Sequence, residues 1–392
     1  MDLGADWLVA KPEGNNLLHR VAQNNNVTVC KVLLKDKSRP AATMINDKNQ
    51  AGNTPLFEAC SKISPKIVRM LLESGADCNI HCNDGRTALH MAASCDAGAD
   101  MVTLLLKHGA KHDALNKNKS TPLILAASGG AEKVVQILLD AGADANAANH
   151  MTALHRAARW GHLSCVKLLV EKGRADCNVR GENGRPPLVV AICYRHREVF
   201  EYLVQLPSIE IAAIDLQYVI TSTSDQLGVD LLAERLKSEG RLDDKCEPYC
   251  TALQAAAWMG RTDTVRKLLE LGANPNIMGG DHGCALNAAV ENDNLEIVQL
   301  LLDHHAAVTV TEYGVEQPIF CAIRQASLEI FQLLLVKMSH EEQLAVRSTG
   351  GQPMLQYAVC EEKNRIIDCL VSHELGFSDI KDASGHTPRP GE

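Results

Sequence analysis

The sequence has few aromatic residues, no long hydrophobic run and no excess of positive charge. Aromatic residues make up 4% of the 392 residues, although 46% are hydrophobic, and this composition favours closely packed small helices over a β-sandwich. The formal net charge of −9 gives no electrostatic reason to expect direct binding of nucleic acid, which requires a basic surface. No stretch approaches the roughly 18 apolar residues that a membrane-spanning helix needs.

The first residues lack the features of an export signal. The segment "MDLGADWLVAKPEGNN" has neither a basic flank nor a long apolar core. The chain contains 14 cysteines, but none is spaced as C-x-x-C, and most fall within apolar helical patterns. Cysteines of this kind are expected to be reduced and to behave as small hydrophobic residues. The predicted location is therefore the cytoplasm, with the nucleus as the alternative.

Motifs for nucleotide binding and for metalloprotease chemistry are missing. The chain has no G-x-x-x-x-G-K-[ST], no G-x-G-x-x-G and no H-E-x-x-H. The strongest metal candidate is "CNIHC", in which Cys78, His81 and Cys82 could supply soft ligands. A structural zinc site needs four ligands at defined spacing. We therefore predict no catalytic residue, no metal and no cofactor, and keep these three residues as a weak alternative.

A phrase of about eight residues returns with a period near 33 residues. Each occurrence carries small apolar residues and is followed by a second apolar run. The phrase begins at residues 15, 53, 86, 120, 151, 185, 250, 284, 317 and 352. A fixed period of this length is the signature of a repeat architecture.

The occurrence at Met151 indicates what the phrase does locally. Thr152 can cap the first helical N–H groups, and Leu154 with the two following alanines forms a small apolar face at helical spacing. Gly161 is predicted to end this helix. The run "LSCVKLLVEKG" is predicted to form an antiparallel second helix, with Gly173 as its left-handed C-cap.

These phrases resemble the ankyrin repeat, with its T-P-L-H-x-A-A start, G-H turn and V-x-L-L-L-x-x-G-A-D-x-N end, over nearly the whole chain. The resemblance implies an all-α repeat solenoid, an ankyrin-repeat stack of antiparallel helix pairs with short β-hairpin loops. It also implies that His155, whose position holds Phe, Ile or Gln in other repeats, hydrogen-bonds to the neighbouring repeat. The asparagines of the G-A-D-x-N segment would bond to the hairpin backbone; they are Asn79, Asn146, Asn178 and Asn276.

The period also divides the chain into about ten to eleven repeats, one of them degenerate. We expect five to six N-terminal repeats over 1–205, a degenerate repeat over 206–247, C-terminal repeats over 248–376, and a truncated repeat start with a tail over 377–392. Within the degenerate repeat, two helical runs are predicted at 216–221 and 227–236. The alternative is that the chain is a piece of a longer array.

The resemblance places binding on the concave face, which is built from hairpin tips and from the two residues after the Ala pair of each first helix. These positions become aromatic and basic in the middle of the array. The candidate partner-binding residues are Met151, Arg159, Trp160, Arg185, Tyr194, Tyr249, Trp258 and Met259. Trp, Tyr and Arg are the residues most enriched in interface hot spots. The alternative is that each indole packs against the helix of its neighbouring repeat.

The predicted function is a non-enzymatic protein–protein interaction scaffold or adaptor that binds a partner protein or peptide in the concave groove. A second hypothesis is a regulatory segment of a larger signalling protein, because residues 283–306 resemble the divergent repeats of NACHT-type ATPases, or a co-regulator. A third is a metal-binding or enzymatic protein. We expect a monomer that contacts neither nucleic acid nor a membrane directly.

Overall fold

The computed structural model describes residues 13–35, 44–147, 151–223, 225–310 and 314–372. The chain divides into two compact units, unit 1 (Met1–Ile209) and unit 2 (Glu210–Glu392). In the described ranges the backbone forms helices and turns, with one isolated antiparallel bridge between Cys246 and Cys250. None of the described helices is long and apolar enough to cross a membrane. The predicted repeat start and tail at 377–392 lie outside the described residues.

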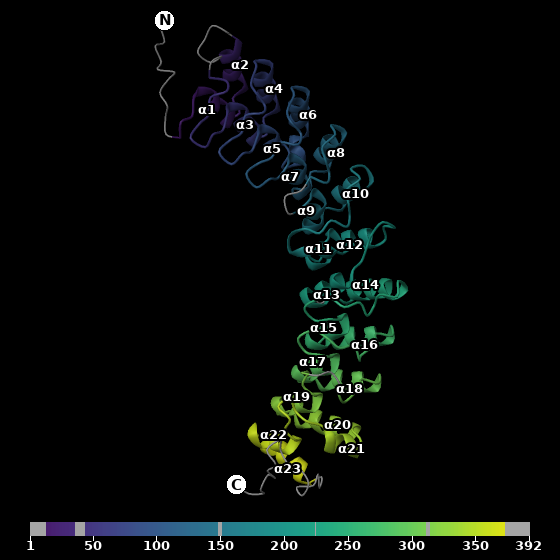
Figure 1. The fold of residues 1–392 in the computed structure, drawn as a ribbon. Helices are drawn as coiled ribbons and strands as arrows, with labels where there is room; N and C mark the ends of the chain where they lie inside the picture. Colours follow the sequence, from purple (N-terminus) through teal and green to yellow (C-terminus); the bar gives the residue numbers. More distant parts are fainter. Residues whose placement is uncertain (1–12, 36–43, 148–150, 224, 311–313, 373–392) are drawn as a thin grey trace. The chain divides into compact units, whose positions relative to one another are not determined.

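Unit 1 contains helix pairs in which a shorter inner helix is followed by a longer outer helix (Figure 1). The inner helices are α1 (Leu17–Gln23), α3 (Pro55–Ser61), α5 (Ala88–Ala92), α7 (Pro122–Ser128), α9 (Ala153–Trp160) and α11 (Pro187–Cys193). The outer helices are α2 (Val27–Lys35), α4 (Pro65–Glu73), α6 (Ala99–Lys107), α8 (Glu132–Asp140), α10 (Leu163–Glu171) and α12 (Arg197–Val204). Short 3-10 turns occur at η2 (Asp96–Gly98) and η3 (Glu182–Gly184).

Unit 2 repeats this arrangement with one additional helix. Its inner helices are α13 (Ala213–Ser222), α15 (Ala252–Trp258), α17 (Ala285–Glu291), α19 (Pro318–Gln325) and α22 (Met354–Cys360). Its outer helices are α14 (Gln226–Ser238), α16 (Thr262–Glu270), α18 (Leu295–Asp303), α20 (Leu328–Lys337) and α23 (Asn364–Ser372), and α21 (His340–Ala345) lies between α20 and α22. Within each unit, inner helices pack on inner helices and outer on outer, as the solenoid resemblance implies.

The inner helices begin at side-chain caps. The hydroxyl of Thr152 accepts a hydrogen bond from the His155 N–H at 3.3 Å, which satisfies a donor that the helix itself leaves unpaired. Thr54, Thr121 and Thr251 cap α3, α7 and α15 in the same way. The helix α9 ends at Gly161, which is left-handed with φ of 74°, as predicted.

The prediction for Gly173 is wrong. The left-handed residue after α10 is Arg174, with φ of 50°. This repeat has one more residue between its second helix and its Ala-Asp pair than the repeat before it, and the extra residue takes the left-handed position. Gly173 instead allows a close approach, because a Cβ there would lie 2.8 Å from the carbonyl oxygen of Leu169.

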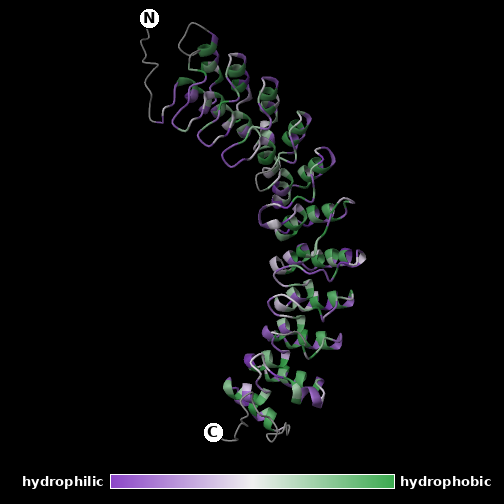
Figure 2. Ribbon diagram, in the orientation of Figure 1, coloured by the Kyte–Doolittle hydropathy of each residue, from purple (hydrophilic) through white to green (hydrophobic). Residues whose placement is uncertain are grey.

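The core of each unit lies between its two helical layers. In α9, Leu154, Ala157 and Ala158 are fully buried, and in α10 Val166 and Leu169 are fully buried. The alanines keep neighbouring inner helices close, while each buried Leu or Val contributes roughly 1.5–3 kcal/mol. Hydrophobic residues accordingly gather along the helices, with hydrophilic residues at the turns of unit 1 (Figure 2).

The segment 206–247 contains α13 and α14. Both helices extend beyond the predicted runs of 216–221 and 227–236. No threonine cap begins α13; instead the carboxylate of Asp215 accepts a hydrogen bond from the Ala212 N–H at 2.9 Å. Asp215 is fully buried, so this acceptor is part of the core rather than of the surface.

Candidate partner-binding surface

The histidine of the repeated phrase is a scaffold residue. His155 Nδ1 accepts a hydrogen bond from the Thr152 N–H at 3.2 Å, so Nε2 carries the proton and donates to the Arg185 carbonyl oxygen at 3.1 Å, in the next repeat. Equivalent bonds join His19 to the Asn53 carbonyl at 2.8 Å and His90 to the Ser120 carbonyl at 3.0 Å. The predicted inter-repeat role of His155 is therefore confirmed.

Unit 2 keeps this bond with different side chains. Gln254 Nε2 donates to the Gly283 carbonyl oxygen at 3.5 Å and to the Ile277 carbonyl oxygen at 2.8 Å, and Asn287 Nδ2 donates to the Glu316 carbonyl oxygen at 2.8 Å. In unit 1, burial lowers the pKa of both His90 and His155 to about 4. These imidazoles are therefore neutral at pH 7 and are fully engaged in holding repeats together.

The asparagines of the G-A-D-x-N segment form a second ladder between repeats. Asn79 Nδ2 donates to the Gly109 carbonyl oxygen at 3.0 Å, and its Oδ1 accepts from the Lys111 N–H at 3.0 Å. Asn146, Asn178 and Asn276 donate in the same way to the carbonyls of Arg174, Ser208 and His305. These side chains bond to the backbone of the next repeat, as the resemblance implied, and are committed to the scaffold.

Three of the predicted partner-binding residues, the exposed Trp160 and Tyr194 and the half-buried Arg159, lie at the ends of α9 and α11 in unit 1, and we call them the aromatic ridge. Trp160 is 55% exposed and Tyr194 is 47% exposed. The guanidinium of Arg159 lies over the ring of Tyr194, 4.8 Å from its centroid. His196 Nε2 donates to the Arg159 carbonyl oxygen at 2.8 Å and so holds the end of α9 beside the turn that follows α11.

Two other predicted residues of unit 1 lie off this ridge. Arg185 is half-buried, and its carbonyl oxygen is the acceptor for His155. Met151 is only 7% exposed, so its place among the surface residues is a wrong prediction. It directly precedes the buried cap Thr152 and is drawn into the core with it.

A pocket of about 600 Å³ lies between α5, α7 and the hairpins that precede them, and α7 packs on α9, which carries Arg159 and Trp160. Met91 and Leu125 line it from the helices, and Arg86 and Lys117 line it from the hairpins. Its floor includes Gly129, where a Cβ would overlap the Ser94 carbonyl oxygen, so only glycine fits. These lining residues were not among those predicted from the sequence. The position directly after the histidine of the repeated phrase varies between repeats, and this variation could have pointed to Met91 and Leu125.

The remaining predicted residues belong to unit 2. The indole of Trp258 stacks on the imidazole of His282, with ring centroids 4.1 Å apart. Tyr249 and Met259 are half-buried. One face of the Trp258 indole is thus covered within the chain by His282, a hairpin residue of the next repeat.

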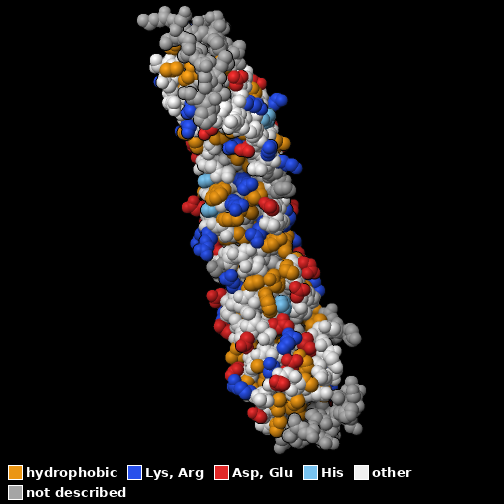
Figure 3. Space-filling view, turned by 90° about the vertical axis from the view of Figure 1, so that its left-hand side faces the viewer, with side chains coloured by type: hydrophobic (Ala, Val, Ile, Leu, Met, Phe, Trp, Pro, Cys, Tyr) orange, Lys and Arg blue, Asp and Glu red, His pale blue; other side chains and the backbone are white. Residues whose placement is uncertain are grey.

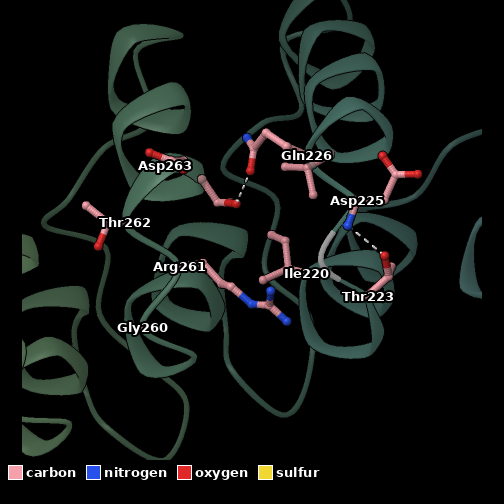
Figure 4. Close-up of a pocket in the computed structure, with 10 residues that line it drawn as sticks. Ile220, Thr223, Asp225, Gln226, Gly260, Arg261, Thr262 and Asp263 are labelled. Carbon is pink, nitrogen blue, oxygen red and sulfur yellow. Dashed lines mark hydrogen bonds between the residues drawn. The ribbon is translucent and has the colours of Figure 1, made fainter.

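A second pocket, of about 390 Å³, lies within unit 2 where the turn of α13 and α14 meets the turn of α15 and α16 (Figure 4). Arg261 occupies the position where His162 of unit 1 bonds to the Ser128 carbonyl. Its side chain extends toward Ile220, while Thr264 donates to Gln226 Oε1 at 2.9 Å. Asp225 and Asp263 also line the pocket, so its charges are mixed.

The weak metal candidate is not assembled. Cys78 and Cys82 are buried, whereas His81 is exposed, so the thiols and the imidazole point to different environments. Cys78 Sγ donates to the His108 carbonyl oxygen at 3.5 Å, and His81 Nδ1 lies 2.8 Å from the Gly85 carbonyl oxygen. Across the part of the chain that the structure describes, no three His, Cys, Asp or Glu side chains are close enough to hold a metal ion.

Comparison with known proteins agrees with this architecture. The family model described as "Ankyrin repeats (3 copies)" matches residues 3–82, 66–149, 142–215 and 256–343. The chain is 32% identical over 161 residues to the Neurogenic locus notch homolog protein 1 of Homo sapiens, which covers 41% of this chain and 6% of that protein.

Two further relatives match in the same way. A putative ankyrin repeat protein of Acanthamoeba polyphaga mimivirus is 29% identical over 217 residues, 54% of this chain and 28% of its own length. The B-cell lymphoma 3 protein homolog of Mus musculus is 35% identical over 170 residues, 42% of this chain and 36% of its own length. The matched segment spans well under half the length of each relative. The chain belongs to the ankyrin-repeat family.

Proposed function

We propose that this chain is a non-enzymatic interaction module that binds an extended segment of a partner protein on the aromatic ridge of unit 1. The observation that carries this proposal is the exposure of Trp160 and Tyr194, at 55% and 47%, on positions that the scaffold does not use. Large exposed aromatic side chains beside an arginine are the usual make-up of a binding hot spot. Ankyrin repeats are generally protein–protein interaction modules, which supports the same reading.

An extended segment suits this surface better than a small molecule does. The ridge and the neighbouring pocket together follow the ends of α5, α7, α9 and α11, so they offer a row of contacts rather than one enclosed cavity. Small-molecule sites usually bury most of the ligand's surface. A row along stacked repeats is how solenoids present extended binding surfaces.

We further propose that the protein acts in the cytoplasm or the nucleus, as a monomer. All 14 cysteines are free thiols in the structure. Free thiols persist in these reducing compartments, whereas exported proteins tend to pair them.

A second candidate function is recruitment within a larger protein. The observation that favours it is the small fraction of the relatives that the match covers, 6% of the human Notch homolog and 28% of the mimivirus protein. On this reading the same ridge would bind a partner, and the rest of the larger protein would act on it.

Affinity capture from a cell lysate tests the proposed surface. The wild-type chain is compared with a Trp160→Ala, Tyr194→Ala variant and with Tyr202→Ala, which removes an aromatic side chain from the outer helix α12. We expect specific proteins to be captured by the wild type and by Tyr202→Ala, and to be lost from the double variant. Capture of the same proteins at the same level by all three chains would contradict the proposal. Circular dichroism checks that each variant is folded.

A further inference from the structure

The two units carry opposite net charge. Unit 1 contains 25 Lys or Arg residues against 20 Asp or Glu residues, a formal net charge of +5. Unit 2 contains the other 14 Lys or Arg residues and 28 Asp or Glu residues, a formal net charge of −14. The net charge of −9 for the whole chain is therefore the sum of an acidic unit 2 and a basic unit 1, and unit 1 carries the aromatic ridge.

Several carboxylates of unit 1 are held by its backbone at the bases of the hairpins. Asp77, Asp144 and Asp176 each accept a hydrogen bond from the N–H two residues later, at 2.8, 2.9 and 2.8 Å. Asp113 accepts from the Asp144 N–H of the next repeat at 3.2 Å. These groups stabilise the turns and lie at the ends of the outer helices rather than in the pocket.

The cations near the pocket are mostly without carboxylate partners. Arg86 pairs with Asp84 at 3.0 Å. Lys117 lines the pocket and is exposed, and none of the ion pairs among the described residues of unit 1 includes it. The same is true of Arg156 and Arg159 in this part of the chain, and the Arg159 guanidinium lies over the Tyr194 ring.

Arg156 extends the row of pocket-lining residues into the next repeat. It directly follows His155, as Met91 follows His90 and Leu125 follows the equivalent Ile124. Because Met91 and Leu125 both line the pocket, Arg156 continues their line along the inner helices. The pocket, whose hydrophobic side chains are Met91 and Leu125, is thus bordered by Lys117 and by Arg86 with its partner Asp84 on the hairpins, and by positive charge on α9. Lys and Arg side chains lie beside hydrophobic ones on this face of unit 1 (Figure 3).

We infer that the partner segment is acidic and carries one apolar anchor residue. The anchor fills the pocket over Met91, Leu125 and Gly129, and the flanking Asp or Glu carboxylates face Lys117, Arg156 and Arg159. This inference rests on the proposed function and adds the chemistry of the partner. Charge complementarity of this kind sets the choice of partner and the rate of association.

A protein segment fits this surface better than nucleic acid does. The net charge of unit 1 is small beside its size, whereas binding of nucleic acid draws on many cations that neutralise successive phosphates. Met91 and Leu125 in the pocket also favour contact with an aliphatic or aromatic side chain, which an acidic peptide can supply.

Selection from a random dodecapeptide library displayed on phage, with the full chain immobilised, tests the inference. We expect the enriched peptides to have more Asp and Glu than the input library, clustered around one Leu, Ile, Met or Phe. A fluorescent version of the best peptide then gives Kd by anisotropy. Arg156→Glu with Arg159→Glu is expected to weaken binding by about tenfold or more, because two favourable charge contacts become repulsive.

The matched control is Lys133→Glu with Lys167→Glu, which makes the same charge change on the outer helices α8 and α10. This control should change Kd by less than about twofold, as expected for charges away from an interface. Circular dichroism establishes that both variants are folded.

The remaining outcomes separate the two proposals. Enriched peptides that lose binding with Trp160→Ala and Tyr194→Ala but are not acidic would overturn the inference and leave the proposed function standing. Acidic peptides that bind the Arg156→Glu, Arg159→Glu variant unchanged would also overturn the inference. Peptides indifferent to Trp160 and Tyr194, or no enrichment over an empty support, would overturn both. Displacement of the best peptide by an equal concentration of single-stranded DNA would assign the surface to nucleic acid and overturn the inference.

Discussion

The indole of Trp258 stacks on the imidazole of His282, with ring centroids 4.1 Å apart and 21° between the ring planes. His282 Nδ1 lies 2.6 Å from one oxygen of Glu291, and Arg324 donates to the other oxygen at 2.6 Å. Trp258 is therefore joined to α17 and α19 through the hairpin that carries His282. Trp160 ends its inner helix in the same way, yet more than half of its surface is exposed.

The two tryptophans should differ in their effect on stability. Trp258→Ala removes a stacked pair, and aromatic pairs contribute about 0.5–1.5 kcal/mol beyond the area they bury. We expect it to lower the free energy of unfolding by roughly 2 kcal/mol, against less than about 0.5 kcal/mol for Trp160→Ala at the surface. Urea unfolding followed by circular dichroism measures both. Equal destabilisation by the two substitutions would show that Trp160 is also a packing residue.

His155→Gln should reduce the dependence of stability on pH. Burial lowers the pKa of His155 to about 4 in the folded chain, while an unfolded histidine has its ordinary pKa of 6.5. Between these values the unfolded state binds more protons than the folded state, so stability is full above pH 6.5 and is lost as the pH falls toward 4. The loss approaches about 1.4 kcal/mol per pH unit for this one group.

Glutamine is the matched replacement because Gln254 bonds to the backbone of the next repeat in unit 2, at Ile277 and Gly283, without titrating. We expect the variant to unfold at a similar urea concentration at pH 7 and to lose less stability than the wild type at pH 5. His155→Ala, which removes the bond itself, should be less stable at both values by about 1 kcal/mol or more. If the glutamine variant lost as much stability between pH 7 and pH 5 as the wild type does, the lowered pKa assigned to His155 would be contradicted.

Much of the scaffold could be predicted from the sequence because its signals are local and recur in every repeat. Thr152 directly precedes the helix that it caps. The position of His155 is held by Phe or Gln in other repeats, which already indicates a structural role. The left-handed residue after α10 could not be placed, because one extra residue moves it from Gly173 to Arg174. The metal candidate failed for a related reason: spacing within a loop does not say which side chains turn inward.

The candidate surface was predictable only in part. Arg159, Trp160 and Tyr194 stand at positions that the repeat leaves variable, and their exposure follows from that. The pocket depends on side chains from two hairpins and two helices, and on the close approach of Gly129 to Ser94, which no single repeat reveals. The positive net charge of unit 1 became apparent only once the boundary at Ile209 was known, because the larger negative charge of unit 2 makes the net charge of the whole chain negative.

Gly161→Ala should destabilise unit 1 more than Gly142→Ala. Both glycines have positive φ, 74° and 89°, so alanine costs about 1 kcal/mol at either position. At Gly161 the added methyl group would also overlap the ring of His196, which bonds to the Arg159 carbonyl, whereas nothing lies within 4 Å of a methyl group at Gly142. We expect a loss of roughly 2–3 kcal/mol for Gly161→Ala. Thermal unfolding measures the pair, and similar midpoints would show that His196 moves aside without loss.

Alkylation by iodoacetamide should begin at Cys360. This thiol is exposed at the end of α22, whereas Cys60 is fully enclosed and burial raises its pKa far above the usual range. The thiolate is the reactive form, so access favours Cys360, while burial and a raised pKa both protect Cys60. Mass spectrometry of peptides after short exposure of the native chain should find Cys360 modified first and Cys60 modified only after urea is added. Cys360→Ser should remove the fast phase and leave the slow one. Rapid modification of Cys60 in the native chain would mean that α3 opens readily, against the full burial of its core residues.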